Sequence, residues 1–270
     1  MVKTVDVGGI KTTYKILHPN KSRTVVILHG LRGDHQALLT LGRTLADFRV
    51  IIPDLPGHGS SAQLEVHNIE SYADWLNGFL RALNLKGVII IGHSYGANIA
   101  MAAIPSDGGR RIGKAIHFVM YPRYHNSGIN KGVKLLYSFG KKIPRKHSDR
   151  VLHSRVISLL TIRTMVHTKD KRLARWIVDD GHRAAQNVSS KVIEDIFEEM
   201  SGVDMRKYLN DCVPQLFIVT SEDKFSHNQE IKLISDSLKN SELVELDNLG
   251  HLAPLEDPQR LVSSIAHWLN

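Results

Sequence analysis

Short apolar runs alternate with amphipathic segments along most of the chain, and this alternation is the feature that most constrains the fold. The runs have the length and continuous apolar character of strands that are covered on both faces. They are residues 24–28, 49–53, 88–91, 115–120, 216–219 and 243–246. The segments between them carry apolar residues at helical spacing, at 34–47, 69–83, 96–103 and 230–238. This alternation predicts an α/β fold with a doubly wound, mostly parallel sheet.

A different kind of segment interrupts the alternation after Tyr121. From residue 122 to residue 208 the sequence is helical in pattern, basic and poor in strand signals. Residues 110–183 contain 18 Lys and Arg but only 4 Asp and Glu, so they carry the excess behind the chain's net charge of +8. We therefore expect a core domain formed by residues 1–121 and 209–270. A basic helical cap, residues 122–208, would be inserted between two core strands.

A G-x-S-x-G motif at residues 92–96 directly follows the buried run 88–91 and precedes a helical segment. At such a strand-to-helix turn the serine backbone is strained, and its Oγ projects from the edge of the sheet. Ser94 is therefore the candidate nucleophile. A serine hydroxyl attacks well only when a base removes its proton and an acid orients that base.

The topology narrows the choice of base and acid. His251 lies in the loop between the last predicted strand and the last helix, at the same carboxyl edge of the sheet as Ser94. Asp223 follows the strand 216–219 at that edge and is the first choice for the acid, with Glu222 as the alternative. The order serine, acid, histidine along the chain is the order that hydrolases of this topology use.

Two backbone N–H groups are candidate donors to an oxyanion hole, which would stabilise the charge of a tetrahedral intermediate. Leu31 follows the strand 24–28, and Tyr95 stands directly after Ser94 at the head of a helix. Neither role depends on a particular side chain, so Leu31 is expected to tolerate replacement.

Taken together, these residues resemble the α/β-hydrolase fold superfamily, in the serine-triad branch of small esterases and C–C bond hydrolases. The matching motifs appear in family order and cover about residues 1–121 and 209–270. They are His29-Gly30 and residues 54–61, 92–96, 220–224 and 250–258. The resemblance implies an α/β-hydrolase fold whose helical insertion acts as a lid over the active site.

Three classes of function fit these features. The first is a serine hydrolase of the carboxylesterase type (EC 3.1.1) that cleaves a small-molecule ester through an acyl-serine; thioesters and lactones would pass through the same steps. The second, which rests on the resemblance, is a C–C bond hydrolase or a lyase like that of the menaquinone pathway, using the same triad on an anionic substrate. The third is a ligand receptor on a hydrolase scaffold.

Apart from attraction to an anionic membrane or to nucleic acid, which has the least support, the basic insertion has two interpretations. One is a solvated helical surface without a specific ligand. The other is recognition of an anionic substrate by some of its basic side chains, because an arginine fork suits carboxylates and phosphates. The candidates are Arg123, Lys131, Lys134, Arg155 and Arg163.

Several other partners have little support. No aromatic-and-basic motif indicates nucleic-acid binding, and no apolar run approaches the roughly 18 residues of a membrane span. No clustered Cys and His spacing indicates a metal site, so neither a metal nor another cofactor is expected. Cys212 is the single cysteine, and the first residues lack a signal-peptide pattern. We expect a soluble, cytoplasmic protein, and the oligomeric state stays open.

Overall fold

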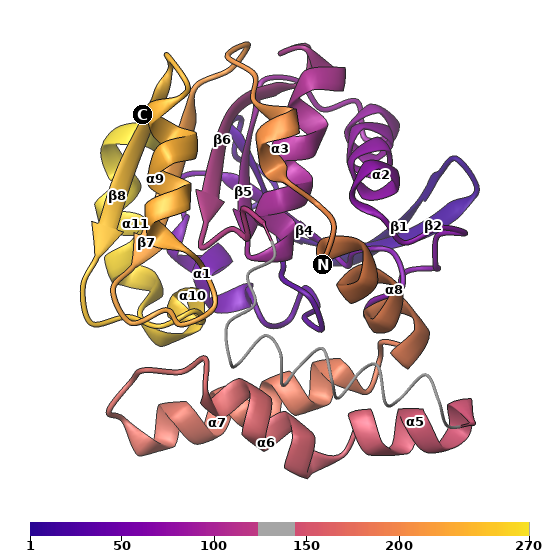
Figure 1. Ribbon diagram of the computed structural model, residues 1–270. Helices are drawn as coiled ribbons and strands as arrows, with labels where there is room; N and C mark the ends of the chain where they lie inside the picture. Colours follow the sequence, from indigo (N-terminus) through magenta and orange to yellow (C-terminus); the bar gives the residue numbers. More distant parts are fainter. Residues whose placement is uncertain (124–143, 270) are drawn as a thin grey trace.

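The computed structural model describes residues 1–123 and 144–269. Within them an eight-stranded sheet lies at the centre, with helices on both faces and further helices beneath its carboxyl edge (Figure 1). The strand order is β1-β2-β4-β3-β5-β6-β7-β8, antiparallel only where β1 pairs with β2 and β2 with β4. The strands are β1 (Val2–Val7), β2 (Ile10–Leu17), β3 (Thr24–Leu28), β4 (Arg49–Pro53), β5 (Val88–His93), β6 (Ile112–Phe118), β7 (Gln215–Thr220) and β8 (Ser241–Leu246).

The helices fall into two groups by their place in the chain. Those that alternate with the strands are α1 (Leu39–Thr44), α2 (Ile69–Ala82), α3 (Tyr95–Asp107), α9 (Asn228–Asp236), α10 (Ala253–Glu256) and α11 (Pro258–Leu269). Those between β6 and β7 are α5 (Arg145–Leu152), α6 (Arg155–Arg163), α7 (Lys171–Ala185), α8 (Ser190–Met200) and the short 3₁₀ helix η1 (Met205–Tyr208). This is the doubly wound α/β architecture that the alternation predicts.

Each face of the sheet has its own apolar core. Along β5, Val88 and Ile90 pack into the cluster that contains α2, α3 and α9, whereas Ile89 and Ile91 pack into the cluster of α1 and α11. A strand buried on both faces needs apolar side chains at every position, which explains the continuous runs in the sequence. The sheet can therefore hold its carboxyl edge as a rigid platform.

Several predicted elements have different bounds in the structure, and for two of them a local interaction or backbone angle explains the difference. The helix expected at 34–47 is reduced to α1, because the carboxylate of Asp34 accepts hydrogen bonds from the backbone N–H of Gln36 and Ala37 and holds that stretch in turns. The strand expected at 115–120 is β6, which begins three residues earlier and ends before Val119. Val119 has a positive φ of 43°, which an extended strand cannot accommodate.

Of the helices between β6 and β7, α5, α6 and α7 form a layer below the carboxyl edge in Figure 1, and α8 rises from that layer toward α2. The buried Val192, Ile193 and Ile196 of α8 belong to the same apolar cluster as α2 and α3. Helix α8 therefore packs into the same apolar core as α2 and α3. In residues 1–123 and 144–269, no helix combines the length and the apolar character that crossing a membrane requires.

Candidate active site

Ser94 occupies a strained turn between β5 and α3. Its φ of 53° and ψ of −119° are rare for a residue with a side chain. The neighbouring glycines have no room for a larger residue: a Cβ on Gly92 would lie 2.5 Å from the Cα of Ala97, and a Cβ on Gly96 would lie 2.5 Å from the carbonyl oxygen of Leu28. The turn therefore holds Ser94 at the carboxyl edge of the sheet.

Three residues from separate loops form one hydrogen-bonded chain. Ser94 follows β5, Asp223 follows β7, and His251 follows β8. His251 Nδ1 donates to Asp223 Oδ2 at 2.7 Å, and His251 Nε2 accepts from Ser94 Oγ at 2.9 Å. The His251 side chain is 6% exposed and that of Asp223 is fully buried. The geometry presents a serine hydroxyl whose proton can pass to an imidazole.

The electrostatics keep Asp223 ionised. Burial by itself would raise the pKa of this carboxyl, but the charge and hydrogen bond of His251 outweigh burial and lower it to about 2. The backbone N–H groups of Phe225 and Ser226 also donate to Asp223 Oδ1, at 2.7 and 3.3 Å. Asp223 can therefore hold the His251 ring in one tautomer throughout the neutral range. Glu222, the alternative acid, is partly exposed and lies 3.8 Å from His167.

The two candidate oxyanion donors also lie beside the nucleophile. Leu31 and Tyr95 line the same cavity as Ser94. Tyr95 is the first residue of α3, where backbone N–H groups have no partner within the helix. The loop that carries Leu31 approaches the serine closely, because a Cβ on Gly30 would lie 3.1 Å from the Cβ of Ser94.

A cavity of about 200 Å³ opens in front of Ser94 and His251, between the carboxyl edge of the sheet and helices α6, α7 and α8. Most of its lining is apolar. The apolar side chains include Leu31, Leu38, Ile162, Met165, Ile177, Ala184, Phe197, Met200, Phe225, Leu252 and Leu255. Arg32 and Asp180 are the charged residues of the described lining. No cluster of His, Cys, Asp or Glu in the described part of the chain could hold a metal ion.

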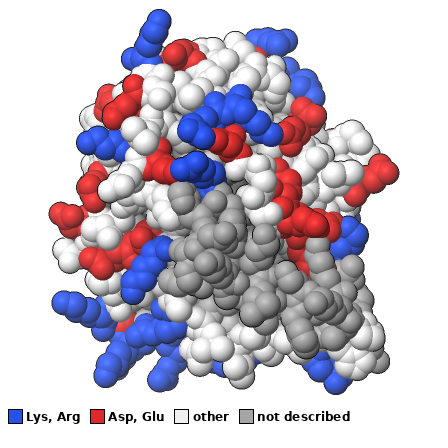
Figure 2. Space-filling view, in the orientation of Figure 1, with Lys and Arg blue, Asp and Glu red and all other residues white. Residues whose placement is uncertain are grey.

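The basic residues considered from the sequence lie elsewhere. None of Arg123, Arg155 and Arg163 belongs to the described lining of the cavity. Arg123 pairs with Glu230, Arg155 pairs with Asp179, and Arg163 is exposed at the end of α6. Lys131 and Lys134 lie outside the described residues. Figure 2 shows many Lys and Arg side chains at the lower left of this face, where α6 and α7 lie in Figure 1.

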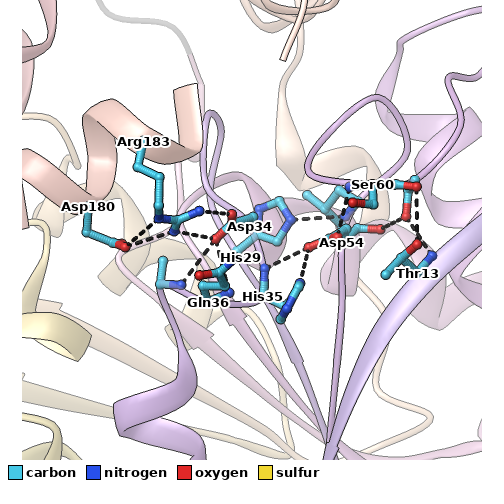
Figure 3. Close-up of polar contacts among 12 residues, drawn as sticks. Thr13, His29, Asp34, His35, Gln36, Asp54, Ser60, Asp180 and Arg183 are labelled. Carbon is cyan, nitrogen blue, oxygen red and sulfur yellow. Dashed lines mark hydrogen bonds and ion pairs between the residues drawn. The ribbon is translucent and has the colours of Figure 1, made fainter. Parts of the chain in front are cut away.

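An ion pair that the sequence did not suggest joins α7 to the loop after β3. Arg183 donates from both terminal nitrogens to Asp34, whose side chain is 3% exposed, and it also donates to Asp180 (Figure 3). Burial would raise the pKa of Asp34, but the hydrogen bonds and charge of Arg183 lower it below its ordinary value. A contact across 149 residues of sequence leaves no local signal that could have predicted it.

A second buried carboxylate holds the same loop from the core side. Asp54 Oδ1 accepts from the backbone N–H and from the Nδ1 of His35, both at 2.8 Å, and Asp54 Oδ2 accepts from the backbone N–H of Ser60 (Figure 3). His29 Nε2 in turn accepts from the backbone N–H of Leu55 at 3.0 Å. The loop that carries Leu31 is therefore tied to both the core and α7.

Removing Arg183, the cation that pairs with Asp34, is expected to destabilise the fold. Arg183→Gln leaves the Asp34 carboxylate buried without a counter-ion, which should cost about 3 kcal/mol of unfolding free energy at pH 7. Because the pKa of Asp34 is lowered in the folded protein, its contribution is full above the ordinary carboxyl pKa of about 4 and is lost as pH falls through the folded value. The difference between wild type and variant should therefore shrink below about pH 4. Urea unfolding across this pH range measures it.

A matched control is available on α8. Lys191 pairs with Asp195 one turn away on an exposed surface, so Lys191→Gln should change the free energy of unfolding by less than about 0.5 kcal/mol. Adding Asp34→Asn to Arg183→Gln should recover part of the loss, since the buried charge is then gone. If Arg183→Gln and Lys191→Gln have equally small effects on the free energy of unfolding, the Arg183–Asp34 pair is no stronger than a surface pair.

Comparison with known proteins gives a family match over most of the chain. Residues 25–264 match the model of a family described as "Alpha/beta hydrolase family". The chain is 26% identical to "Proline iminopeptidase PfmaB" of Pestalotiopsis fici over 286 aligned positions, which cover 100% of this chain and 99% of that protein. A shorter match, 35% identical over 79 residues, is to the "2-succinyl-6-hydroxy-2,4-cyclohexadiene-1-carboxylate synthase" of Escherichia coli and covers 29% of this chain and 31% of the synthase.

Solved structures with the same fold agree over the whole length. The esterase EaEST of Exiguobacterium antarcticum superposes with a TM-score of 0.84 at 18% identity, covering 100% of this chain and 99% of the esterase. At this level of identity the likeness establishes the shared fold alone.

Proposed function

Because the chain belongs to the alpha/beta hydrolase family, we propose that it is a serine hydrolase that cleaves carboxylic esters through an acyl-serine intermediate. The observation that carries the proposal is the hydrogen-bonded chain from Asp223 through His251 to Ser94, opening on a mostly apolar cavity. A nucleophile, a base and an orienting acid in that order are the groups that acyl transfer requires.

In the proposed reaction, Ser94 Oγ attacks the ester carbonyl while His251 Nε2 accepts its proton. The carbonyl oxygen becomes an oxyanion, which the backbone N–H groups of Leu31 and Tyr95 stabilise. His251 then donates the proton to the departing alcohol, and the acyl group stays on Ser94. Water that is deprotonated by His251 releases the acid. Asp223 keeps Nδ1 protonated and balances the charge of the imidazolium.

We also propose that residues 122–208 form a cap over a core made of residues 1–121 and 209–270. Helices α6, α7 and α8 contribute Ile162, Ile177 and Phe197 to the wall of the cavity that Ser94 also lines. An apolar wall of this kind favours the acyl or alcohol chain of an ester and excludes water from the acyl-serine.

Labelling with a fluorophosphonate probe, beside turnover of short p-nitrophenyl esters, tests the proposal. We expect one adduct, located by mass spectrometry at Ser94, and release of p-nitrophenol. The full-length relative named as an iminopeptidase makes L-proline p-nitroanilide a necessary further substrate. Faster turnover of the anilide than of any ester would replace the esterase proposal with a peptidase. Absence of both labelling and turnover would contradict an activated serine.

A second candidate function has one specific observation in its favour. The match to the Escherichia coli synthase keeps a lyase or C–C bond hydrolase on a carboxylated substrate under consideration. Such an enzyme would use His251 as a base and would label at Ser94 without turning over simple esters. The combination of labelling and failed ester turnover therefore separates the two candidates.

A further inference from the structure

Arg32 lines the cavity that contains Ser94 and His251. It stands one residue after Leu31, in the loop that leaves β3. One terminal nitrogen donates to the carbonyl oxygen of Leu152, at the end of α5, over a long 3.3 Å. The Nε of Arg32 is buried and has no hydrogen-bond partner among the described residues. The other terminal N–H groups also have no hydrogen-bond partner within the described residues, and these are the donors that are left for a ligand.

The charge of Arg32 also lacks a partner within the described residues, where no carboxylate lies at ion-pair distance from it. Asp180 lines the same cavity and accepts from Arg183 through its Oδ1 at 2.8 Å, while its Oδ2 is buried without a hydrogen-bond partner among the described residues. Residues 124–143 contain neither Asp nor Glu. Arg32 is partly exposed, and the cavity that it lines is where an anion can reach its charge.

The backbone of Arg32 strengthens the argument. Its φ of 65° lies in the left-handed region, where Gly and Asn are the favoured residues and a long side chain has no conformational advantage. The loop could therefore be built more easily without arginine. A guanidinium offers what the favoured residues lack, a planar fork that matches both oxygens of a carboxylate.

We propose that Arg32 binds a carboxylate of the substrate, separate from the ester that Ser94 attacks. The preferred substrates are then monoesters of dicarboxylic acids or similarly charged esters. The inference rests on the proposed function for the identity of the reacting group, but not for the binding of the anion. The residue that recognises an anionic substrate then lies in the loop beside the nucleophile, and not on the basic surface of the insertion.

Equilibrium binding to the Ser94→Ala protein tests this without turnover. The probes are monoethyl succinate, monoethyl glutarate and monoethyl adipate, each compared by calorimetry with its uncharged terminal amide. At least one monoanion should bind about tenfold more tightly than its amide, as expected for a charge-assisted pair. In Ser94→Ala/Arg32→Asn that ratio should fall to about one. Asparagine is chosen because it tolerates the left-handed backbone, and Arg32→Lys should give an intermediate ratio.

Arg163→Gln in the same background is the matched control. It removes an exposed arginine outside the described lining of the cavity, so the ratio of the two affinities should stay as in the parent. Arg32 would instead be a structural contact to α5 if Arg32→Asn weakened the acid and the amide equally. Monoanions that bind no better than their amides, or do not bind at all, also overturn the proposal.

The outcomes separate this inference from the proposed function. A wild-type protein that hydrolyses no ester, while its Ser94→Ala variant keeps an Arg32-dependent preference for the monoanions, would retain the carboxylate site and reject the esterase. Ester turnover by the wild type, together with equal affinity of the Ser94→Ala variant for acid and amide, would retain the esterase and reject the carboxylate site.

Discussion

Ser94→Ala is expected to lower kcat for p-nitrophenyl esters by a factor of about 10⁴ or more, with residual turnover supported by the oxyanion donors and substrate binding alone. The physical reason is that alanine removes the oxygen that forms the acyl intermediate. Fluorophosphonate labelling should disappear with activity. Steady-state kinetics and intact-mass spectrometry on the purified variant measure both effects.

The variant should keep the wild-type fold, since the alanine methyl occupies the place of the serine Cβ. Its urea unfolding midpoint therefore serves as the control, and a shift of the midpoint would mean that lost activity reports lost structure. Retention of a tenth or more of the wild-type kcat in a folded Ser94→Ala protein would place the nucleophile elsewhere.

The second large effect is expected for Asp223→Asn, with kcat lower by about 10⁴. Asp223 accepts from His251 Nδ1 at 2.7 Å, and this bond places the ring proton on Nδ1, so that Nε2 is free to accept from Ser94. An asparagine side chain can donate to Nδ1 instead and stabilise the opposite tautomer, which leaves Nε2 protonated and unable to act as a base. Rates at a single pH measure the loss of activity in Asp223→Asn. A pH profile of kcat/KM for the same variant then tests whether the lost step is proton acceptance by His251.

Glu222→Gln is the matched control for this variant, since Glu222 is the adjacent acid and lies beside His167 rather than His251. Its kcat should remain within about threefold of wild type, as for most surface substitutions. A reversal, in which Glu222→Gln loses activity and Asp223→Asn keeps it, would assign the orienting acid to Glu222.

The sheet was predictable from the sequence because its strands are buried on both faces. A strand that is buried on two sides needs an apolar residue at every position, and the runs at 88–91 and 216–219 show this pattern within their own sequence. The bounds of α1 and β6 were less accurate. Asp34 and Val119 adopt local conformations that depend on side-chain hydrogen bonds and a positive φ, and periodicity carries no information about either.

The residues of the candidate site were also predictable only in part. By itself, the sequence indicated which residues to consider, because Ser94, Asp223 and His251 each follow a buried strand and the ends of parallel strands meet at one edge. It could not rank the arginines, since a basic residue looks the same whether its charge is solvated, paired or turned into a cavity. Only the tertiary structure put Arg32 in the cavity wall and Arg183 on Asp34. Charge partners are set by distances in space between segments far apart in the chain, whereas strands and turns are set by neighbours.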